Sequence, residues 1–270
     1  MGLVVMVLSL LVGPAPGLAA DSPPGPGRAT GCPPPVAGGG KEAWAGQRTW
    51  QALEREGYRL GRLRTRVSDV YPGRSLPWYQ ELANTIHIES RAEAVRSLLT
   101  VASGDPVEAA RIYEAERQLR SHDFLVEARL VPLRCSGGRV DAEVRVRDAW
   151  TLEVGAGFGS AGGEATSSAR IRERNLLGTG KTLFVGWVDG RERRTGAFGY
   201  ADPAVLGSPW TFGITHRNLT DGHRNSVNLA YPFRRVDQTW GLRARSEDLR
   251  KEVPFEQAGE EAYAARMDAE

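Results

Sequence analysis

The run Asn175-Leu-Leu-Gly-Thr-Gly-Lys181 is the segment whose residue types come nearest to a known chemical site. A glycine-rich loop that ends in Gly-Lys-Thr binds phosphate in many nucleotide-hydrolysing enzymes, because its amides and its lysine surround the anion. That pattern needs a glycine where this chain has Asn175, a buried strand before the loop and a helix after it. Instead, residues 169–174 carry charge at nearly every second position, and the following segment alternates as a strand. We therefore predict a tight turn between two strands and no nucleotide site.

Other side chains that could do chemistry are scattered along the chain. The sequence contains no nucleophile elbow and no Ser-His-Asp arrangement, and its histidines lack a spacing to cysteines or carboxylates that would bind metal. We predict a structural role for His87, which lies in a motif discussed below. We predict no catalytic residue, no metal site, no cofactor and no enzymatic activity. The histidines are His87, His122, His216 and His223.

The composition excludes two broad classes of function. The chain has 270 residues and a formal charge of +2, and it contains no long basic block, so a nucleic-acid partner is not implied. The mean hydropathy is −0.37, and no internal apolar run reaches ~18 residues, which excludes a helical membrane protein. A membrane β-barrel remains, because its strands are apolar on one face only and average out as hydrophilic.

The first forty residues have the composition of a targeting segment and a spacer. Leu3–Val12 is almost wholly apolar and is followed by small residues up to Ala20, so we predict a signal peptide over residues 1–20, although it lacks the usual positive start. The alternative is a buried N-terminal strand. Residues 21–40 are mostly Pro and Gly and predict a disordered linker. Cys32 lies in this linker, and the sequence leaves open whether it pairs with Cys135, the other cysteine.

Residues 57–148 predict a small mixed α/β domain, preceded by a short helix from Trp44 to Glu56. Arg59–Tyr71 is strand-like. Ser90-Arg-Ala-Glu93 matches a capping box, in which Ser90 begins a helix with Val95 and Leu98 on its apolar face. Asp105-Pro106-Val107-Glu108 predicts the start of a second helix, with Asp105 as its N-cap.

The same domain should end in a hairpin of two strands, Phe124–Leu133 and Val140–Val146. Ser136-Gly137-Gly138 lies between them and supplies the glycines that a tight turn needs. The second strand alternates cleanly, with valine or alanine at every even position from Val140 to Val146. The predicted order is strand, helix, helix, strand, strand.

From Trp150 onward the sequence predicts strands of about nine to eleven residues, the length with which a tilted strand crosses a bilayer. One face carries aromatic and aliphatic residues, and the other carries glycine, threonine and arginine. This arrangement is typical of an apolar exterior around a polar lumen. A soluble β-sandwich is the alternative. The clearest apolar sets are Leu152, Val154, Ala156 and Phe158; Leu183, Val185 and Trp187; Trp210, Phe212 and Ile214; and Val227, Leu229 and Tyr231.

Several motifs occur in the order known from one protein superfamily. The segments Leu82–Ser90 to Tyr113–Arg120 resemble a POTRA (polypeptide-transport-associated) domain. Later motifs resemble the start of the barrel that follows such a domain in outer-membrane assembly factors of the BamA and TamA type and in bacterial surface antigens. The similarity covers about residues 57–245. These later motifs are Arg147–Leu152, Asn175–Lys181, Tyr200–Pro203, Asp221-Gly222 and Tyr231–Phe233.

The resemblance implies an α+β POTRA-like domain of order β-α-α-β-β at residues 57–148, followed by an antiparallel transmembrane β-barrel of about sixteen strands. Residues 150–270 have room for about seven or eight such strands, so we predict the N-terminal part of a barrel. The last residues lack the terminal aromatic of a typical barrel. Because an open sheet edge in lipid leaves backbone groups unsatisfied, we expect a truncated copy rather than a stable half-barrel.

The resemblance also implies a function in inserting or exporting proteins at the outer membrane of a Gram-negative bacterium, with the N-terminal domain in the periplasm. The expected partners are unfolded outer-membrane or secreted clients, outer-membrane lipid and periplasmic accessory proteins. We expect a client to add as an extra strand along Val140–Val146 or Leu63–Val70. The glycine-rich strand Thr151–Gly159 is the expected barrel seam. A passive pore and a soluble periplasmic binding module are the alternative functions.

Overall fold

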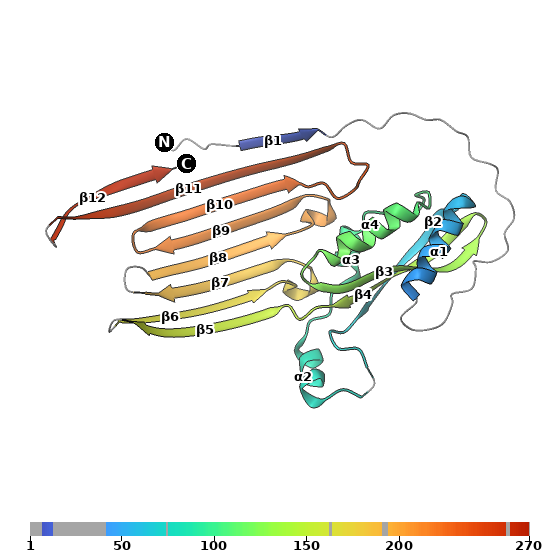
Figure 1. The fold of residues 1–270 in the computed structure, drawn as a ribbon, viewed down its shortest axis with the longest axis horizontal. Helices are drawn as coiled ribbons and strands as arrows, with labels where there is room; N and C mark the ends of the chain where they lie inside the picture. Colours follow the sequence, from blue (N-terminus) through green and yellow to red (C-terminus); the bar gives the residue numbers. More distant parts are fainter. Residues whose placement is uncertain are drawn as a thin grey trace. The chain divides into compact units, whose positions relative to one another are not determined.

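The computed structural model describes residues 7–12, 42–73, 75–161, 164–190, 194–257 and 260–269 (Figure 1). The chain divides into two compact units. One consists of Met1–Val12, Thr151–Pro232 and Trp240–Glu270, and contains a large sheet. The other consists of Gly13–Trp150 and Phe233–Thr239 and is called the module here. Each unit is described by itself.

The module is built from four helices and one three-stranded sheet. The sheet has the order β2-β4-β3, in which β2 runs parallel and β3 antiparallel to the central β4. The predicted strand-helix-helix-strand-strand order is observed, with one further helix, α2, after the first strand. The elements are α1 (Glu42–Arg55), β2 (Arg59–Ser68), α2 (Trp78–Ile86), α3 (Ala92–Leu98), α4 (Ala109–Arg120), β3 (Leu125–Ser136) and β4 (Arg139–Asp148).

The core of the module lies between its helices and one face of this sheet. The even positions of β4 from Val140 to Val146 are at most 2% exposed, as the alternation predicted. Ile112, Ala115 and Leu119 lie on one face of α4 and are also buried, at 1% or less. The hairpin turn is confirmed, because Gly137 and Gly138 both have positive φ between β3 and β4.

Two predicted helix starts are wrong. Ser90 is not the cap of α3: helix α3 begins at Ala92, and the amide of Ser90 donates to the carboxylate of Asp148 at 2.8 Å. Asp105 is not the cap of α4, which begins four residues later at Ala109. Its carboxylate accepts instead from the amide of Ala102. In both cases a residue with good capping chemistry is used to fix a loop, a choice that tertiary packing makes.

The large sheet has nine strands and is antiparallel throughout. Eight of them lie between residues 152 and 269, which agrees with the seven or eight predicted. From β5 to β12 each strand pairs with the next strand in the chain, so this part is a meander (Figure 1). The strands are β5 (Leu152–Ala161), β6 (Glu164–Glu173), β7 (Thr182–Asp189), β8 (Arg194–Asp202), β9 (Thr211–Leu219), β10 (Gly222–Tyr231), β11 (Trp240–Gln257) and β12 (Glu260–Ala269).

The ninth strand, β1 (Val7–Val12), comes from the segment predicted as a signal peptide. It pairs antiparallel with the first part of β11, from Val7 opposite Arg245 to Val12 opposite Trp240. This pairing matches the alternative of an N-terminal strand. The signal peptide stays a prediction, and the predicted linker at residues 21–40 lies outside the described residues.

The apolar face of the large sheet is exposed. Cross-strand partners such as Ile171 and Val185, or Ile214 and Val227, share this face, and their exposed fractions lie between 36% and 55%. Among the described residues this unit contains one sheet, whereas a β-sandwich buries such a face between two sheets.

Two further observations concern the helices and the cysteines. No described helix is both long and apolar enough to cross a bilayer. Cys135 is disulfide-bonded, and Cys32, the other cysteine of the sequence, lies outside the described residues.

Acid should weaken the module through His122, which lies in the turn between α4 and β3. Burial lowers the pKa of His122 to about 4 from 6.5. The unfolded chain therefore binds the proton more readily, and stability falls as the pH drops from about 6.5 to about 4, by about 2–3 kcal/mol. As the pH falls from about 6.5 to about 4, we expect the unfolding free energy of His122→Gln to decrease less than that of the native chain.

The measurement is urea unfolding at pH 7, 5.5 and 4, followed by hydrogen exchange and mass spectrometry of peptides from residues 109–148. Comparing the variant with the native chain cancels the titration of Glu116, whose pKa burial raises. Identical pH dependence in both proteins would contradict the assignment to His122.

Candidate functional site: strand edges and the turn at Asn175

The segment Asn175–Lys181 forms a turn between β6 and β7, as predicted. A short 3-10 segment, η1 (Leu176–Gly178), follows Asn175. The side chain of Asn175 is buried, and its Oδ1 accepts from the amide of Gly180 at 2.8 Å. The amide of Leu176 donates to the carbonyl of Lys181 and closes the turn. The asparagine that breaks the phosphate-loop pattern is thus the residue that holds this turn.

The amides of this turn are already used within it. Gly178 donates to the Asn175 carbonyl, and Thr179 donates to the Leu176 carbonyl. The Lys181 ammonium lies 3.2 Å from the carboxylate of Asp202, which raises the pKa of Lys181. A phosphate loop needs free amides and a free lysine, so the geometry agrees with the prediction that this run is a turn.

A second turn between β8 and β9 repeats the same backbone. It contains η2 (Val205–Gly207), and its Leu206 has φ 52°, close to the φ of 54° at Leu177 in the first turn. Positive φ is costly for leucine, by roughly 1–2 kcal/mol. The ion pair of Lys181 with Asp202 joins the two turns across β7 and β8. The sequence motifs at 175–181 and 200–203 therefore belong to two turns of the same conformation at one end of the sheet.

Replacing Asn175 should loosen the first turn. In Asn175→Ala the buried amide of Gly180 loses its acceptor, so we expect a loss of about 1–3 kcal/mol in unfolding free energy. Leu177→Gly is the matched control, for which we expect the opposite effect. It removes the cost of positive φ at an exposed leucine, so the unfolding free energy should rise by up to about 1 kcal/mol. Urea titration of the reconstituted chain measures both. A gain for Asn175→Ala would contradict its role in the turn.

The outer edge of β5 carries no partner among the described strands, since β5 ends the sheet order. Its other edge pairs with β6 over its whole length. Gly155, Gly157 and Gly159 point to the same face, opposite the side of Val154 and Phe158. The side chain of Arg170 lies over Gly155, because a Cβ there would come within 2.9 Å of Arg170 Nε. The predicted seam strand is therefore an edge strand that exposes backbone donors and acceptors.

A polar cluster lies on the glycine face next to this edge. Glu153 pairs with Arg172 of β6 at 3.7 Å and with Arg174. The guanidinium of Arg172 lies 5.2 Å from the centre of the Phe184 ring on β7, and Phe184 in turn covers Gly186. Arginine, glutamate and glycine on the side opposite the apolar face match the predicted polar lumen.

The apolar face is bounded at its two ends by different side chains. Near the turns at Leu206 and before β11, Trp210, Tyr231 and Trp240 are in ring contact, with centroid distances of 5.4 Å and 4.3 Å. Towards the other end, Asn225 donates to Asp248 at 3.1 Å. Aromatic residues at the edge of an apolar band are typical of a membrane–water interface.

In the module, the two edges of the sheet are β2 and β3. The predicted client edge at Val140–Val146 is therefore wrong, because β4 is central and pairs on both sides. The sequence pattern gave no sheet order, and the most regular strand was the buried central one. The other predicted edge, near Leu63–Val70, lies on β2, which is at the edge.

The two edges differ in how well they could accept another strand. Strand β3 contains Pro132 and has register shifts beside Leu125 and beside Pro132, which are features that block strand addition. The beginning of β2 is also covered, because the amide of Leu60 donates to the carbonyl of Asp105 at 2.8 Å. From Leu63 to Ser68 the pairing of β2 with β4 is regular and β2 contains no proline. This stretch therefore has none of the features that block strand addition.

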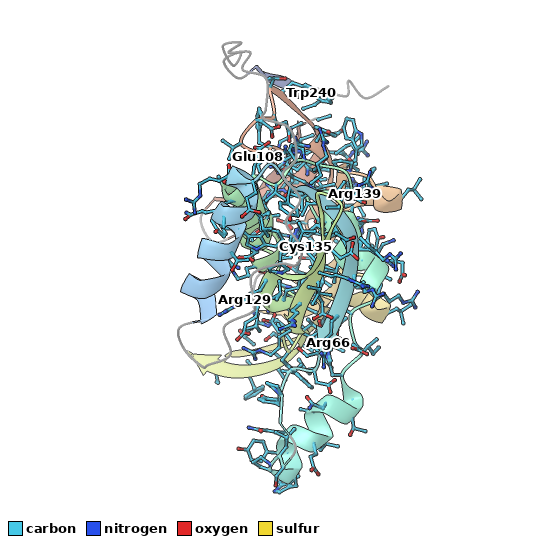
Figure 2. The ribbon with its side chains drawn as sticks, turned by 90° about the vertical axis from the view of Figure 1, so that its right-hand side faces the viewer. Arg66, Glu108, Arg129, Cys135, Arg139 and Trp240 are labelled. Atoms are coloured by element: carbon cyan, nitrogen blue, oxygen red, sulfur yellow. The ribbon has the colours of Figure 1, made fainter. Side chains whose placement is uncertain are left out.

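Three arginines form one row across the solvent face of this sheet. Arg66 on β2 is opposite Arg145 on β4, which is opposite Arg129 on β3. Figure 2 labels Arg66 and Arg129. Like charges directly opposite each other destabilise a sheet. Arg145 is paired with Glu143 at 2.5 Å, and Arg66 and Arg129 are exposed. A client strand added to β2 would therefore meet a basic surface.

His87 is structural, as predicted. Its Nε2 lies 2.8 Å from Oδ2 of Asp148, and both side chains are at most 3% exposed. The other oxygen of Asp148, Oδ1, is buried and has no hydrogen-bond partner among the described residues. This pair joins the segment after α2 to the last residue of β4. No cluster of three metal-binding side chains occurs in the described part of the chain.

Comparisons with known proteins bear on this fold. The chain is similar to BamA and CdiB. A solved structure of BamA from Haemophilus ducreyi lacking POTRA domains 1–3 matches with 15% identity and a TM-score of 0.44, covering 82% of this chain and 47% of that chain. CdiB from Acinetobacter baumannii matches with 11% identity and a TM-score of 0.46, over 73% of this chain and 38% of that chain.

BamA, a protein of the superfamily that the sequence motifs resemble, is among the matched structures. This chain spans less than half the length of either matched chain. No protein-family model and no curated protein matches it.

Proposed function

We propose that this chain acts at the bacterial outer membrane in the insertion or translocation of other proteins, with the module in the periplasm as a POTRA-like domain. The observation that carries this proposal is the exposed apolar face of the large sheet. On β5 alone, Val154 is 71% and Phe158 79% exposed. Lipid hydrocarbon covers such a face in outer-membrane proteins, while the polar face lines the lumen.

The module binds clients in extended form by β-augmentation. The supporting features are the free, regular edge of β2 from Leu63 to Ser68 and the blocked edge of β3 at Pro132. Main-chain hydrogen bonds supply most of the affinity in this mode, so sequence selectivity is low. The row of Arg66, Arg145 and Arg129 favours clients that place acidic side chains on the same face of the extended sheet.

The edge of β5 is the second place at which a client strand pairs. This edge exposes backbone groups, and glycines at three alternate positions weaken the packing that would hold a fixed partner there. A client strand that leaves β2 would template on β5 before it is released into lipid. The partners are therefore unfolded outer-membrane or secreted proteins, outer-membrane lipid and periplasmic accessory proteins, and the activity needs no catalytic chemistry.

Cell fractionation tests the location. We expect the native chain in the outer-membrane fraction, with different electrophoretic migration before and after boiling, and intact-mass measurement reports the ends of the natural chain. Recovery in the soluble periplasmic fraction without detergent would instead support a soluble binding module.

Deletion of residues 57–148 tests the client-binding role. We expect the shortened chain to stay in the membrane and to lose peptide binding. Ion conductance that does not depend on the module, together with unchanged peptide binding, would support a passive pore.

A further inference from the structure

Helix α2 carries the most exposed apolar surface of the module. Trp78, Tyr79, Leu82 and Ile86 occupy one side of this nine-residue helix, and their exposed fractions are 76%, 55%, 51% and 59%. None of the helix residues is buried. In Figure 1 the helix stands apart from the other helices and the sheet of the module. Apolar patches of this kind on a surface usually mark an interaction site.

The module holds α2 by its polar side. The side chain of Asn84 donates to the carbonyl of Tyr71 at 2.9 Å and accepts from the amide of the same residue at 3.2 Å. After the helix, His87 is tied to Asp148 at 2.8 Å. Because both attachments use polar groups, the apolar side is kept outward and has no contact partner that explains it within the described module.

The attachment at Asp148 also places α2 near the end of the module. Asp148 is the last residue of β4, and the first segment of the module ends two residues later, at Trp150. Two residues span at most about 7 Å. The C-terminal end of α2 is therefore close to the point at which the chain leaves the module.

The chemistry of the exposed side fits a lipid surface. Trp78 and Tyr79 are in edge contact at 6.1 Å, and these two residue types are enriched at membrane–water interfaces. The apolar side carries no charge, and the single charged residue of the helix, Glu81, lies beside it. A helix with this division lies in the plane of the interface with its apolar side in the acyl boundary.

A second copy of the chain fits less well. Four side chains exposed by half to three-quarters give a patch on the order of 400–500 Å². A stable protein interface buries about 800 Å² on each partner. The patch is thus too small for a dimer by itself and sufficient for a shallow lipid contact.

We propose that α2 is an interfacial helix that lies in the headgroup–acyl boundary of the leaflet facing the module, beside the point at which the chain leaves the module. This proposal rests on the membrane location in the proposed function. Because the helix has no cation, its insertion depends on burial of apolar surface and not on anionic lipid or low salt.

Site-directed spin labelling of the full chain in neutral phosphatidylcholine vesicles tests this. Leu82→Cys places a nitroxide on the apolar side, and Glu81→Cys, the adjacent exposed residue, is the matched control on the polar side. Val185→Cys on β7 reports whether the large sheet itself lies in lipid. The unmodified chain is the labelling blank, since Cys135 is disulfide-bonded. The readout is relaxation by oxygen, which enters lipid, against relaxation by a water-soluble nickel chelate.

We expect the label at residue 82 to be relaxed several-fold more by oxygen than by nickel, and the label at residue 81 to show the reverse, with no change in 0.5 M salt. Preference for nickel at residue 82, with oxygen preference at residue 185, overturns the helix proposal alone. Exclusion of both reagents from residue 82 also overturns it and indicates a protein contact. Preference for nickel at residue 185 overturns the membrane location on which the proposal rests.

Discussion

Val227→Arg will destabilise the membrane-inserted chain by about 2–4 kcal/mol. Val227 lies in the middle of β10 on the exposed apolar face, opposite Ile214 on β9 and Ser246 on β11. If this face lies in hydrocarbon, the guanidinium must stay near the bilayer centre or pull water into it. Urea titration in phosphatidylcholine vesicles, read from the heat-modifiable band in electrophoresis, measures the loss.

The adjacent residue gives a matched control. Ser226 belongs to the same strand but lies on the other face of the sheet, where its cross-strand partner is Glu247 on β11. An arginine there enters the polar lumen next to a carboxylate, so we expect Ser226→Arg to change stability by less than about 0.5 kcal/mol. Equal losses in the two variants would contradict the assignment of lipid and lumen faces. No loss in either would place the sheet outside hydrocarbon.

A proline in the free edge of β2 will lower client binding by about tenfold to a hundredfold. Successive amides of a strand point to opposite sides. Of the two single variants Thr65→Pro and Arg66→Pro, one therefore loses an amide that bonds β4, and the other loses an amide that points outward. The variant that loses the β4 bond is destabilised by about 1 kcal/mol or more. The other keeps its stability and loses a main-chain donor to the client.

Fluorescence anisotropy with a labelled peptide of the sequence Gly222–Tyr231 measures this binding, and urea titration identifies the stable variant. Pro132 already blocks the edge of β3, so Val131→Pro serves as a control at a strand that we expect to bind no client. If the stable proline variant of β2 binds the peptide as the native chain does, the client edge is not on β2.

The sequence predicted what depends on periodicity. Val140–Val146 alternates over seven residues, and burial of one face follows directly from that pattern. The turn at Asn175 was recognisable because the glycines and the flanking strands agreed. The two predicted helix starts failed for a physical reason: tertiary packing ties the amide of Ser90 to the distant Asp148, and the carboxylate of Asp105 accepts from Ala102 within the preceding loop.

Sheet order and the extra helix could not be obtained in this way. Nothing local distinguishes an edge strand from a central one when the central strand pairs parallel to a distant partner, as β4 does with β2 across about eighty residues. Helix α2 follows a loop with Pro72 and Pro77 and buries nothing, so its apolar residues did not form part of a core pattern. The order of the strands in the module sheet and the exposed helix were therefore visible only in three dimensions.

The meander of the large sheet has a consequence for how this protein is made. Each strand from β6 to β12 pairs with the one delivered just before it, so each of these pairings closes a short loop and the sheet grows by one hairpin at a time. At each stage the newest strand presents an open edge. A half-built copy therefore presents the same kind of open edge as the clients of the proposed function, so we expect that finished copies can assist the assembly of new ones.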